Sequence, residues 1–325
     1  MFSGSMVAIV TPMTADGSLD WPAWDRLLDF HIREGTDAIV VAGTTGESPT
    51  LSGAEIEELT RRAVVRCRDK VKVVVGAGTY DTESTVARTR SLSRLGVDAV
   101  MLVTPYYNKP PQEGLYKHFC AAADASSAPV ILYNVPSRTA VDLLPGTVAR
   151  LARHPRIVAL KEATASLSRG REILSGCPPE FTLLSGDDAS AIDLMSAGAR
   201  GVISVTANVA PRRMHQACQA ALSGNMSEAR AIDSSLQALH RDLFVEASPI
   251  PVKWAVARMG LMGNAIRLPL VELSAKDLPA YCPNPAMARW SAHPRVFIDV
   301  THGEARCPYC GTRYKLRDGE VVKGH

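Results

Sequence analysis

Short apolar runs alternate with longer amphipathic stretches over the first 205 residues of the 325-residue chain. Apolar runs of four or five residues, bounded by polar or turn residues, predict buried strands. Eight strands are expected on this basis, at residues 7–10, 38–41, 71–75, 99–103, 130–133, 157–160, 182–184 and 201–205.

The stretches between these runs predict helices, among them residues 21–34, 54–68, 84–95 and 112–125. Ser52 and Glu55 open the second helix with the spacing of a capping box. Strands alternating with helices predict right-handed βαβ units, and eight repeats favour an α/β fold closed as a (β/α)8 TIM barrel. A doubly wound open sheet is the competing architecture, but no G-x-G-x-x-G motif follows the first strand.

Lys161 follows the apolar run of the sixth strand, so it is expected at the carboxyl end of that strand. Burial lowers the pKa of an ammonium group and leaves a nucleophilic amine, which Schiff-base chemistry on a carbonyl substrate requires. The alternative is a structural lysine whose amine reaches solvent or pairs with Glu162.

Hydroxyl-bearing and polar loops follow several of the predicted strands, where barrel enzymes carry their catalytic groups. Each loop also has a purely structural interpretation as a turn, a core tyrosine or a solvated arginine. Their common position after strands nevertheless favours one shared site, built from residues 43–47, 104–108, 133–138 and 186–188 together with Lys161.

These segments resemble the 4-hydroxy-tetrahydrodipicolinate synthase family from residue 1 to about residue 270. The resemblance implies a pyruvate-dependent class I aldolase of lysine and diaminopimelate biosynthesis, with no organic cofactor. Such enzymes condense pyruvate with L-aspartate 4-semialdehyde and are usually homotetramers built from dimers. The matching segments are MFSGSMVAIVTPM, GTTGESPTL, VTPYYNKPPQEGLY, YNVPSRTAVDLLP, ALKEAT, LLSGDDAS and GVISVTANVAP.

The resemblance implies a role for each site residue. Lys161 would form the Schiff base, and Tyr133 would relay protons together with Thr44 and Tyr107, the last of these entering from a neighbouring subunit. A tyrosine hydroxyl suits this relay because it both donates and accepts hydrogen bonds. The substrates would be held by Thr45 at the pyruvate carboxylate, Arg138 at the aldehyde carboxylate, and Gly186 and Ile203 along the wall.

Two alternative functions stay open at this point. A sugar-acid lyase or aldolase similar to N-acetylneuraminate lyase would share Lys161 and Tyr133, although Thr44, Tyr107 and Arg138 favour the synthase. A non-catalytic barrel scaffold is the other alternative, since function resides in sites rather than in folds.

Composition is consistent with a cytoplasmic enzyme. A net charge of +3 argues against a strongly nucleic-acid-binding surface, and 46% hydrophobic residues support a sizeable core. No apolar run is long enough to span a membrane, and the first strand begins too early for a signal peptide. Four cysteines are scattered before residue 220 and three lie near the end, which suits a reducing compartment better than a disulfide framework.

The last part of the chain departs from the synthase pattern. We expect an aldolase domain at residues 1–270 with a shortened C-terminal helical region, because no closing helix is visible after Leu270. Residues 271–325 would form a compact β-rich zinc module with four ligands: Cys282, His293, Cys307 and Cys310.

HPRVFIDV followed by CPYCGTRYKL resembles the CHCC zinc-finger family. Four protein ligands leave no open position for substrate, so a Zn²⁺ ion there would be structural. A redox Cys-x2-Cys pair and a nucleic-acid contact are less favoured alternatives for this module, because the thioredoxin-like context is missing and short basic runs are usually solvated.

Overall fold

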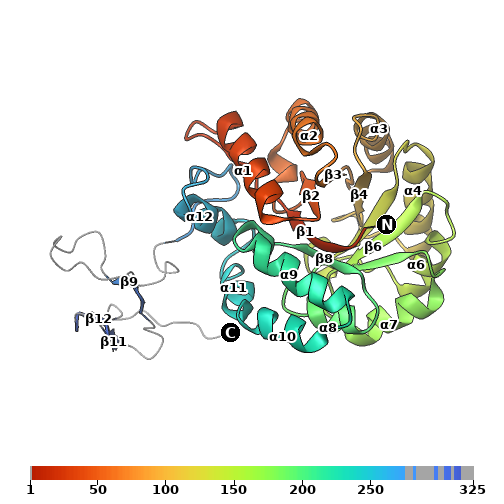
Figure 1. Cartoon of the computed structure of the whole chain (residues 1–325). Coiled ribbons are helices and arrows are strands. Elements are labelled where there is room, and N and C mark those ends of the chain that lie inside the picture. Colours follow the sequence, from red (N-terminus) through yellow and green to blue (C-terminus); the bar gives the residue numbers. More distant parts are fainter. Residues whose placement is uncertain (1, 275–280, 283–295, 299–303, 309–310, 316–325) are drawn as a thin grey trace. The chain divides into compact units, whose positions relative to one another are not determined.

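The computed structural model describes residues 2–274, 281–282, 296–298, 304–308 and 311–315. The chain divides into two compact units, Met1–Glu272 and Leu273–His325, and each is described by itself. The first unit is a closed barrel of eight parallel strands surrounded by helices (Figure 1). This confirms the predicted TIM-barrel fold.

Consecutive strands pair around the barrel, and β1 closes it by pairing with β8. The strands are β1 (Gly4–Ala8), β2 (Ala38–Val41), β3 (Lys72–Gly76), β4 (Ala99–Val103), β5 (Val130–Asn134), β6 (Ile157–Glu162), β7 (Thr182–Ser185) and β8 (Gly201–Ser204).

Helices connect the strands on the outside of the barrel (Figure 1). They are α1 (Trp21–Glu34), α2 (Gly53–Cys67), α3 (Thr82–Leu92), α4 (Gln112–Asp124), α5 (Pro136–Thr139), α6 (Pro145–Leu151), α7 (Leu167–Gly176) and α8 (Ala191–Ser196), followed by α9 (Pro211–Leu222), α10 (Met226–Ser234), α11 (Gln237–Asp242) and α12 (Ile250–Arg258). The short helices η1 (Ser48–Thr50) and η2 (Thr206–Asn208) follow β2 and β8. The predicted capping box of α2 is present, with Ser52 and Glu55 bonded reciprocally.

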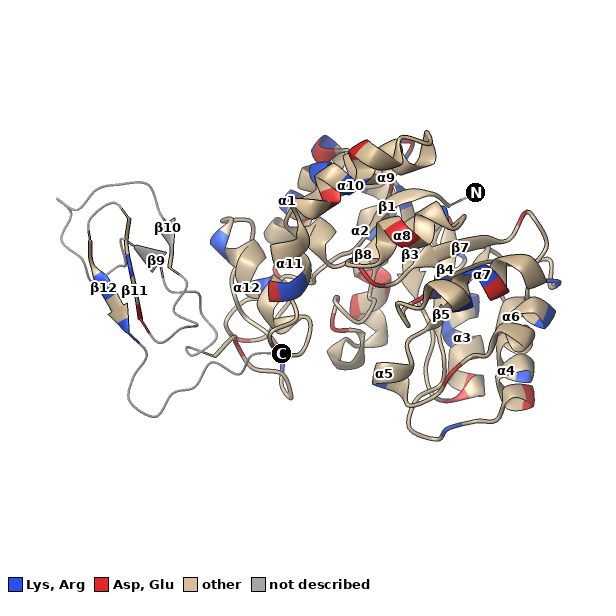
Figure 2. Cartoon of the chain, turned by 90° about the horizontal axis from the view of Figure 1, so that it is seen from below, with Lys and Arg blue, Asp and Glu red and all other residues tan. Residues whose placement is uncertain are grey.

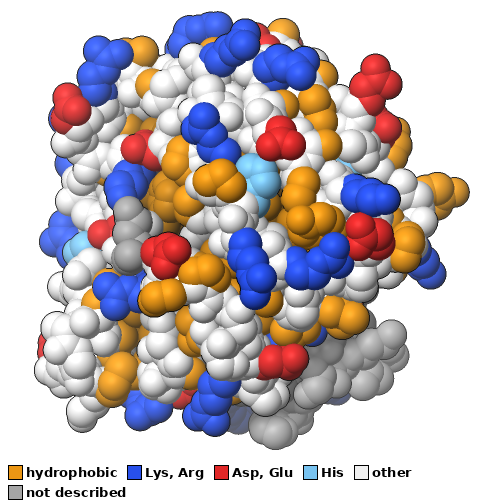
Figure 3. Space-filling view, turned by 90° about the vertical axis from the view of Figure 1, so that its right-hand side faces the viewer, with side chains coloured by type: hydrophobic (Ala, Val, Ile, Leu, Met, Phe, Trp, Pro, Cys, Tyr) orange, Lys and Arg blue, Asp and Glu red, His pale blue; other side chains and the backbone are white. Residues whose placement is uncertain are grey.

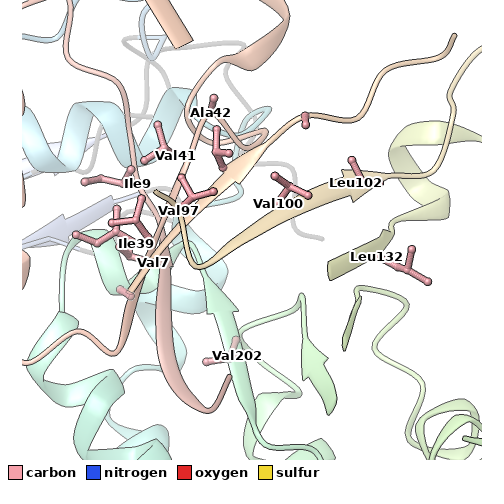
Figure 4. Close-up of a cluster of buried hydrophobic side chains, with 14 of the residues drawn as sticks. Val7, Ile9, Ile39, Val41, Ala42, Val97, Val100, Leu102, Leu132 and Val202 are labelled. Atoms are coloured by element: carbon pink, nitrogen blue, oxygen red, sulfur yellow. The ribbon is translucent and has the colours of Figure 1, made fainter. Parts of the chain in front are cut away.

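The buried hydrophobic residues form two clusters, one inside the barrel and one between the strands and the helices. Because side chains alternate along a strand, neighbouring positions face opposite sides of the barrel wall. The outer cluster includes strand residues such as Val7 and Ile39, which are labelled in Figure 4. It also includes helix residues such as Trp24 and Leu59. The inner cluster draws on all eight strands: Met6, Ala8, Ala38, Val40, Val74, Ala99, Met101, Ile131, Tyr133, Ala159, Leu184 and Ile203.

Strand register places Lys161 on the inner side of the wall. Lys161 pairs with Tyr133 of β5 on one side and with Leu184 of β7 on the other, and both neighbours belong to the inner cluster. Within β6, Ala159 faces the inside and Leu160 the helices, so alternation directs Lys161 inward as well.

Six strands differ from their predicted limits, four of them by a single residue and β1 and β6 by more. β1 spans Gly4–Ala8 rather than residues 7–10, because Gly4 and Ser5 pair with Gly201 and Val202 of β8 to close the barrel. β6 continues to Glu162, two residues beyond the predicted end, because Glu162 still pairs with Ser185 of β7. Lys161 therefore lies within the strand rather than directly after it.

Acidic and basic residues are distributed over the outer helices, and the face in Figure 3 shows both signs interspersed with hydrophobic side chains (Figures 2 and 3). Within the described residues, no helix combines the length and hydrophobicity needed to cross a membrane. After α12, residues 259–274 contain no helix.

The described parts of the second unit contain two short antiparallel strand pairs. β9 (Tyr281–Cys282) pairs with β10 (Val296–Phe297), and β11 (Glu304–Arg306) pairs with β12 (Arg313–Lys315). Between β11 and β12, the N–H of Cys307 donates to the Thr312 carbonyl at 2.9 Å, and the N–H of Gly311 donates to the Cys307 carbonyl at 3.0 Å. Gly311 has a φ of 72°, which glycine adopts without steric cost.

Gly76 sits where the end of β3 passes the loop after β2. A Cβ atom there would overlap the backbone carbonyl oxygen of Ala42, which cannot rotate away as a flexible side chain could. Gly76→Ala should therefore lower the free energy of unfolding by about 1–3 kcal/mol, measured by urea denaturation. Gly53→Ala, at the start of α2 with open space around it, is the matched control and should be neutral. Equal stability of both variants would contradict this account.

Candidate functional site

Lys161 is buried inside the barrel against an aromatic ring. Its side chain belongs to β6, and the residue is 6% exposed. The Nζ atom lies 4.1 Å from the centroid of the Tyr133 ring, on the neighbouring strand β5. The alternatives for Lys161 were an amine reaching solvent or one paired with Glu162. Glu162 instead pairs with Arg169, between the Nε atom and Oε2 at 3.0 Å.

Burial lowers the pKa of the Lys161 ammonium group from 10.5 to about 8. Desolvation is the largest cause, the positive charge of Arg138 acts in the same direction, and the carboxylate of Asp188 partly opposes both. A pKa in this range leaves a substantial fraction of neutral amine near physiological pH, as nucleophilic addition to a carbonyl carbon requires.

Tyr133 is the second buried group of the site, with 6% exposure. Desolvation raises the pKa of its hydroxyl, while the charge of Arg138 and a hydrogen bond with Thr44 lower it. Thr44 lies in the loop after β2 and Tyr133 in β5, so this hydrogen bond joins residues that are far apart in the sequence. The structure therefore brings Lys161, Tyr133 and Thr44 together.

Gly186, after β7, packs directly over the Lys161 side chain. A Cβ atom at Gly186 would lie 2.8 Å from Ala163 Cβ and 3.1 Å from both Cγ and Cε of Lys161. Ile203 of β8 is 1% exposed within the inner cluster that also contains Tyr133, and Thr45 is 3% exposed beside Thr44. Of these three positions, Gly186 is the one that the structure places directly beside the Lys161 side chain.

Thr44 also lines a cavity of about 530 Å³, together with Val135, Arg138 and other residues. Arg138, in the short helix α5, is an exposed residue. Its Nη2 atom donates to the Ser248 carbonyl, just before α12, at 3.5 Å. A guanidinium group at such a position can bind a carboxylate through two parallel hydrogen bonds.

Tyr107 lies apart from the buried group. Its residue is 90% exposed, and its φ of 74° is unusual for a residue other than glycine. Within a single chain, the side chain of Tyr107 is therefore turned to solvent.

Several groups at the site received no role in the sequence analysis. Asp188 is 3% exposed, and its Oδ2 atom accepts hydrogen bonds from the N–H groups of Val205 and Thr206 at 2.9 and 3.1 Å. Glu47 and Lys253 form a fully buried ion pair. The sequence offered a weak signal for Lys253, a charged residue soon after the apolar start of α12, but nothing local identifies its partner.

The predicted zinc ligands fall largely beyond the described side chains. Cys307 is buried in the turn between β11 and β12. Cys282 is described only through its backbone in β9, and His293 and Cys310 lie outside the described residues.

Comparison with protein families gives two matches. The dihydrodipicolinate synthetase family matches residues 1–281, and a zinc-finger domain family of the CHCC type matches residues 280–314. The 4-hydroxy-tetrahydrodipicolinate synthase of Stutzerimonas stutzeri is 56% identical over 274 residues, which are 84% of this chain and 94% of that protein. The synthase of Alcanivorax borkumensis is 54% identical over 279 residues, covering 86% and 95% respectively.

Solved structures with the same fold include a chloride-inhibited dihydrodipicolinate synthase from Acinetobacter baumannii in complex with pyruvate. It has a TM-score of 0.84 and 44% identity, covering 85% of this chain and 95% of that one. The dihydrodipicolinate synthase of Aquifex aeolicus gives a TM-score of 0.83 at 43% identity, covering 85% and 94%.

The lowered pKa of Lys161 predicts how its reactivity depends on pH. Only the neutral amine adds to a carbonyl carbon, so the rate of imine formation with a small keto acid should rise with pH up to about 8 and then level off. The measurement is the rate of borohydride-trapped labelling at Lys161, followed by peptide mass spectrometry from pH 6 to 10. Exposed Lys117 in the same digest is the internal control for non-specific labelling at each pH. A Lys161 rate that keeps rising up to pH 10 would contradict the lowered pKa.

Proposed function

The chain belongs to the dihydrodipicolinate synthetase family, and on that basis we propose that it condenses pyruvate with L-aspartate 4-semialdehyde to 4-hydroxy-tetrahydrodipicolinate. This is a lyase-type aldol reaction of lysine and diaminopimelate biosynthesis. The single observation that carries the proposal is the buried amine of Lys161, which lies against Tyr133 with a pKa near 8.

The proposed reaction begins at Lys161. The neutral amine adds to the keto carbon of pyruvate, and loss of water gives a protonated Schiff base. This imine withdraws electrons, so a methyl proton can leave and an enamine forms. The enamine carbon attacks the aldehyde carbonyl carbon of the second substrate, and the aldehyde oxygen takes up a proton. The amino group of that substrate then adds to the imine carbon, which closes the ring and expels the Lys161 amine. No organic cofactor is needed, because the imine itself is the electron sink.

Tyr133 and Thr44 are proposed to carry protons during imine formation. Tyr133 is close enough to the amine to act on the atoms that react, and the hydrogen bond from Thr44 offsets part of the effect of burial on its pKa. Tyr107 is proposed to complete this chain of hydroxyls from a second subunit. The 90% exposure of Tyr107 in one chain supports a role at an interface.

That role requires a dimer, and we propose a homotetramer built from dimers. One solved relative, 41% identical, is described as a monomeric dihydrodipicolinate synthase variant, so assembly differs between members of the family.

We propose that different residues around the Lys161 amine bind the two substrates. Thr45 and neighbouring backbone N–H groups hold the pyruvate carboxylate, while Gly186 and Ile203 shape the wall beside Lys161. Arg138 binds the carboxylate of L-aspartate 4-semialdehyde. Its position on the 530 Å³ cavity, together with Thr44, supports this assignment.

The two parts of the chain are proposed to act independently. Residues 1–270 form the aldolase domain, and residues 271–325 form a module in which Cys282, His293, Cys307 and Cys310 bind one structural Zn²⁺. The buried thiol of Cys307 in a tight turn with Gly311 suits such a ligand.

A cytoplasmic location is proposed as well. Thiolate ligands suit a reducing compartment, and so do four free cysteines of the barrel: Cys67, Cys120, Cys177 and Cys218.

Lys161→Ala should abolish the pyruvate adduct and nearly all turnover, because no other group supplies the imine nitrogen. The measurement is borohydride trapping with pyruvate, read by intact-mass and peptide mass spectrometry, beside a coupled assay of product formation. Lys117→Ala, which removes an exposed lysine of α4, should retain the adduct and full activity. An adduct on another lysine, or none in the unmodified protein, would overturn the proposed function.

Arg138→Ala should impair use of L-aspartate 4-semialdehyde far more than adduct formation with pyruvate. Loss of a charged hydrogen bond of about 1.5–3 kcal/mol should lower kcat/KM for the aldehyde by roughly 10- to 100-fold. Arg150→Ala, which removes an exposed arginine paired with Glu113, is the matched control and should leave both steps unchanged. Equal loss in both steps for Arg138→Ala would refute its assigned substrate.

Chelation should remove about one Zn²⁺ per chain and unfold the second module, because metal binding supplies most of the folding free energy of such small domains. Pyruvate adduct formation at Lys161 should persist, since class I aldol chemistry needs no metal. Metal analysis and adduct formation should be measured on the same chelated sample. A protein without bound zinc would reject the site, and parallel loss of zinc and adduct would reject independent modules.

A further inference from the structure

The loop after β2 carries a buried carboxylate directly beside the proposed pyruvate-binding residues. Glu47 ends the sequence Gly43-Thr44-Thr45-Gly46-Glu47 and is 2% exposed. Its N–H donates to the Thr44 carbonyl at 3.1 Å, and its φ of 58° lies in the left-handed region, which is unfavourable for a glutamate. The backbone of this loop is therefore held in a conformation that something outside the loop must maintain.

The charge of Glu47 is compensated by residues from the other end of the barrel sequence. Its Oε1 atom accepts a hydrogen bond from Nζ of Lys253 in α12, 206 residues later, and the Lys253 residue is 1% exposed. Its Oε2 atom accepts from the backbone N–H of Arg267 at 3.2 Å. Both carboxylate oxygens are thus bound by the segment that follows β8.

The guanidinium group of Arg267 holds the surroundings of the same loop. It donates to the carbonyl oxygens of Gly17 and Thr50 at 2.8 and 2.7 Å and forms a bidentate pair with Glu55 of α2. The hydrogen bond to Arg267 lowers the pKa of the Glu55 carboxyl to about 2. Arg267, in the segment after α12, therefore contacts both Glu47 in the loop and Thr50 just after it.

Stability alone does not account for the Glu47–Lys253 pair. Both charges lose their hydration, and apolar residues of the same volume often stabilise a core equally well. What an apolar pair lacks is direction, because hydrogen bonds fix where a side chain and its backbone lie. The pair joins Glu47, which has a strained backbone and lies two positions after Thr45, to helix α12, about 200 residues later in the sequence.

We propose that Glu47 and Lys253 are positioning residues that set the Thr44–Thr45 backbone for pyruvate. This rests on the proposed function, in which Thr45 and adjacent N–H groups bind the keto acid carboxylate. The ion pair holds the loop, and the loop presents its donors at a fixed distance from Lys161. Arg267 completes the support by holding the segment from which Lys253 and its own N–H reach Glu47.

Lys253→Met tests the pair, because it keeps the length of the side chain and removes the ammonium group. We expect the KM for pyruvate to rise about tenfold or more, the effect of misplacing one hydrogen bond to a charged group. The KM for the aldehyde should change less than about twofold, because Arg138 lies in α5 and not in the loop after β2.

Val256→Ala is the matched control, since Val256 is fully buried in the same helix and contacts no charged group of the loop in any described interaction. It should lower the melting temperature as Lys253→Met does without changing the KM for pyruvate. A rise of that KM in both variants would show that loosening α12 is sufficient and would overturn a specific role for the pair.

A second variant covers the case in which Lys253→Met leaves an unpaired buried carboxylate and fails to fold. Glu47→Gln combined with Lys253→Met removes both charges, and its KM for pyruvate should still rise. An unchanged KM in either folded variant overturns the proposal. If the unmodified protein forms no adduct at Lys161, the proposed function fails first. If that adduct forms and the variants bind pyruvate normally, only the positioning role fails.

Discussion

Removal of water from a single amine, that of Lys161, is the constraint on which the proposed chemistry of this chain depends. Lys161 faces the inside of a closed barrel, where Tyr133 covers one side and Gly186 allows the backbone to pack over the side chain. Closure matters because an open sheet would leave one face of the strand accessible to solvent or to a helix layer. The inner cluster below the amine is apolar, so hydration is lost with little compensation.

The polar groups around the amine adjust this effect in opposite directions. Arg138 favours the neutral amine and also favours ionisation of the Tyr133 hydroxyl, whereas Asp188 favours the ammonium form of Lys161. One cationic residue thus lowers the pKa values of both groups. In the proposed reaction this favours the neutral amine that adds to the carbonyl carbon and a phenol that can give up its proton.

The end of the barrel domain is both a structural support and a junction. Lys253 and Arg267 contact the loop after β2, and the chain divides into its second unit only a few residues later, after Glu272. The matches to the two families meet at residues 280–281. The residues that hold the loop thus belong to the part of the chain that matches the synthase family. This is consistent with a barrel that works without the metal proposed for the module.

The sequence by itself determined the number and order of the strands, the fold class and the neighbourhood of Lys161, because strand length and hydrophobic period are local properties. It also located the loops that carry Thr44, Arg138 and Gly186. The tertiary structure alone decided that Lys161 faces inward, since the limits of β6 depend on pairing with β7, and those of β1 on pairing with β8. It also decided that Tyr107 is exposed in one chain and that Glu47 is paired with Lys253. The contact between Glu47 and Lys253 joins residues more than 200 positions apart, and it exists only once the barrel has closed.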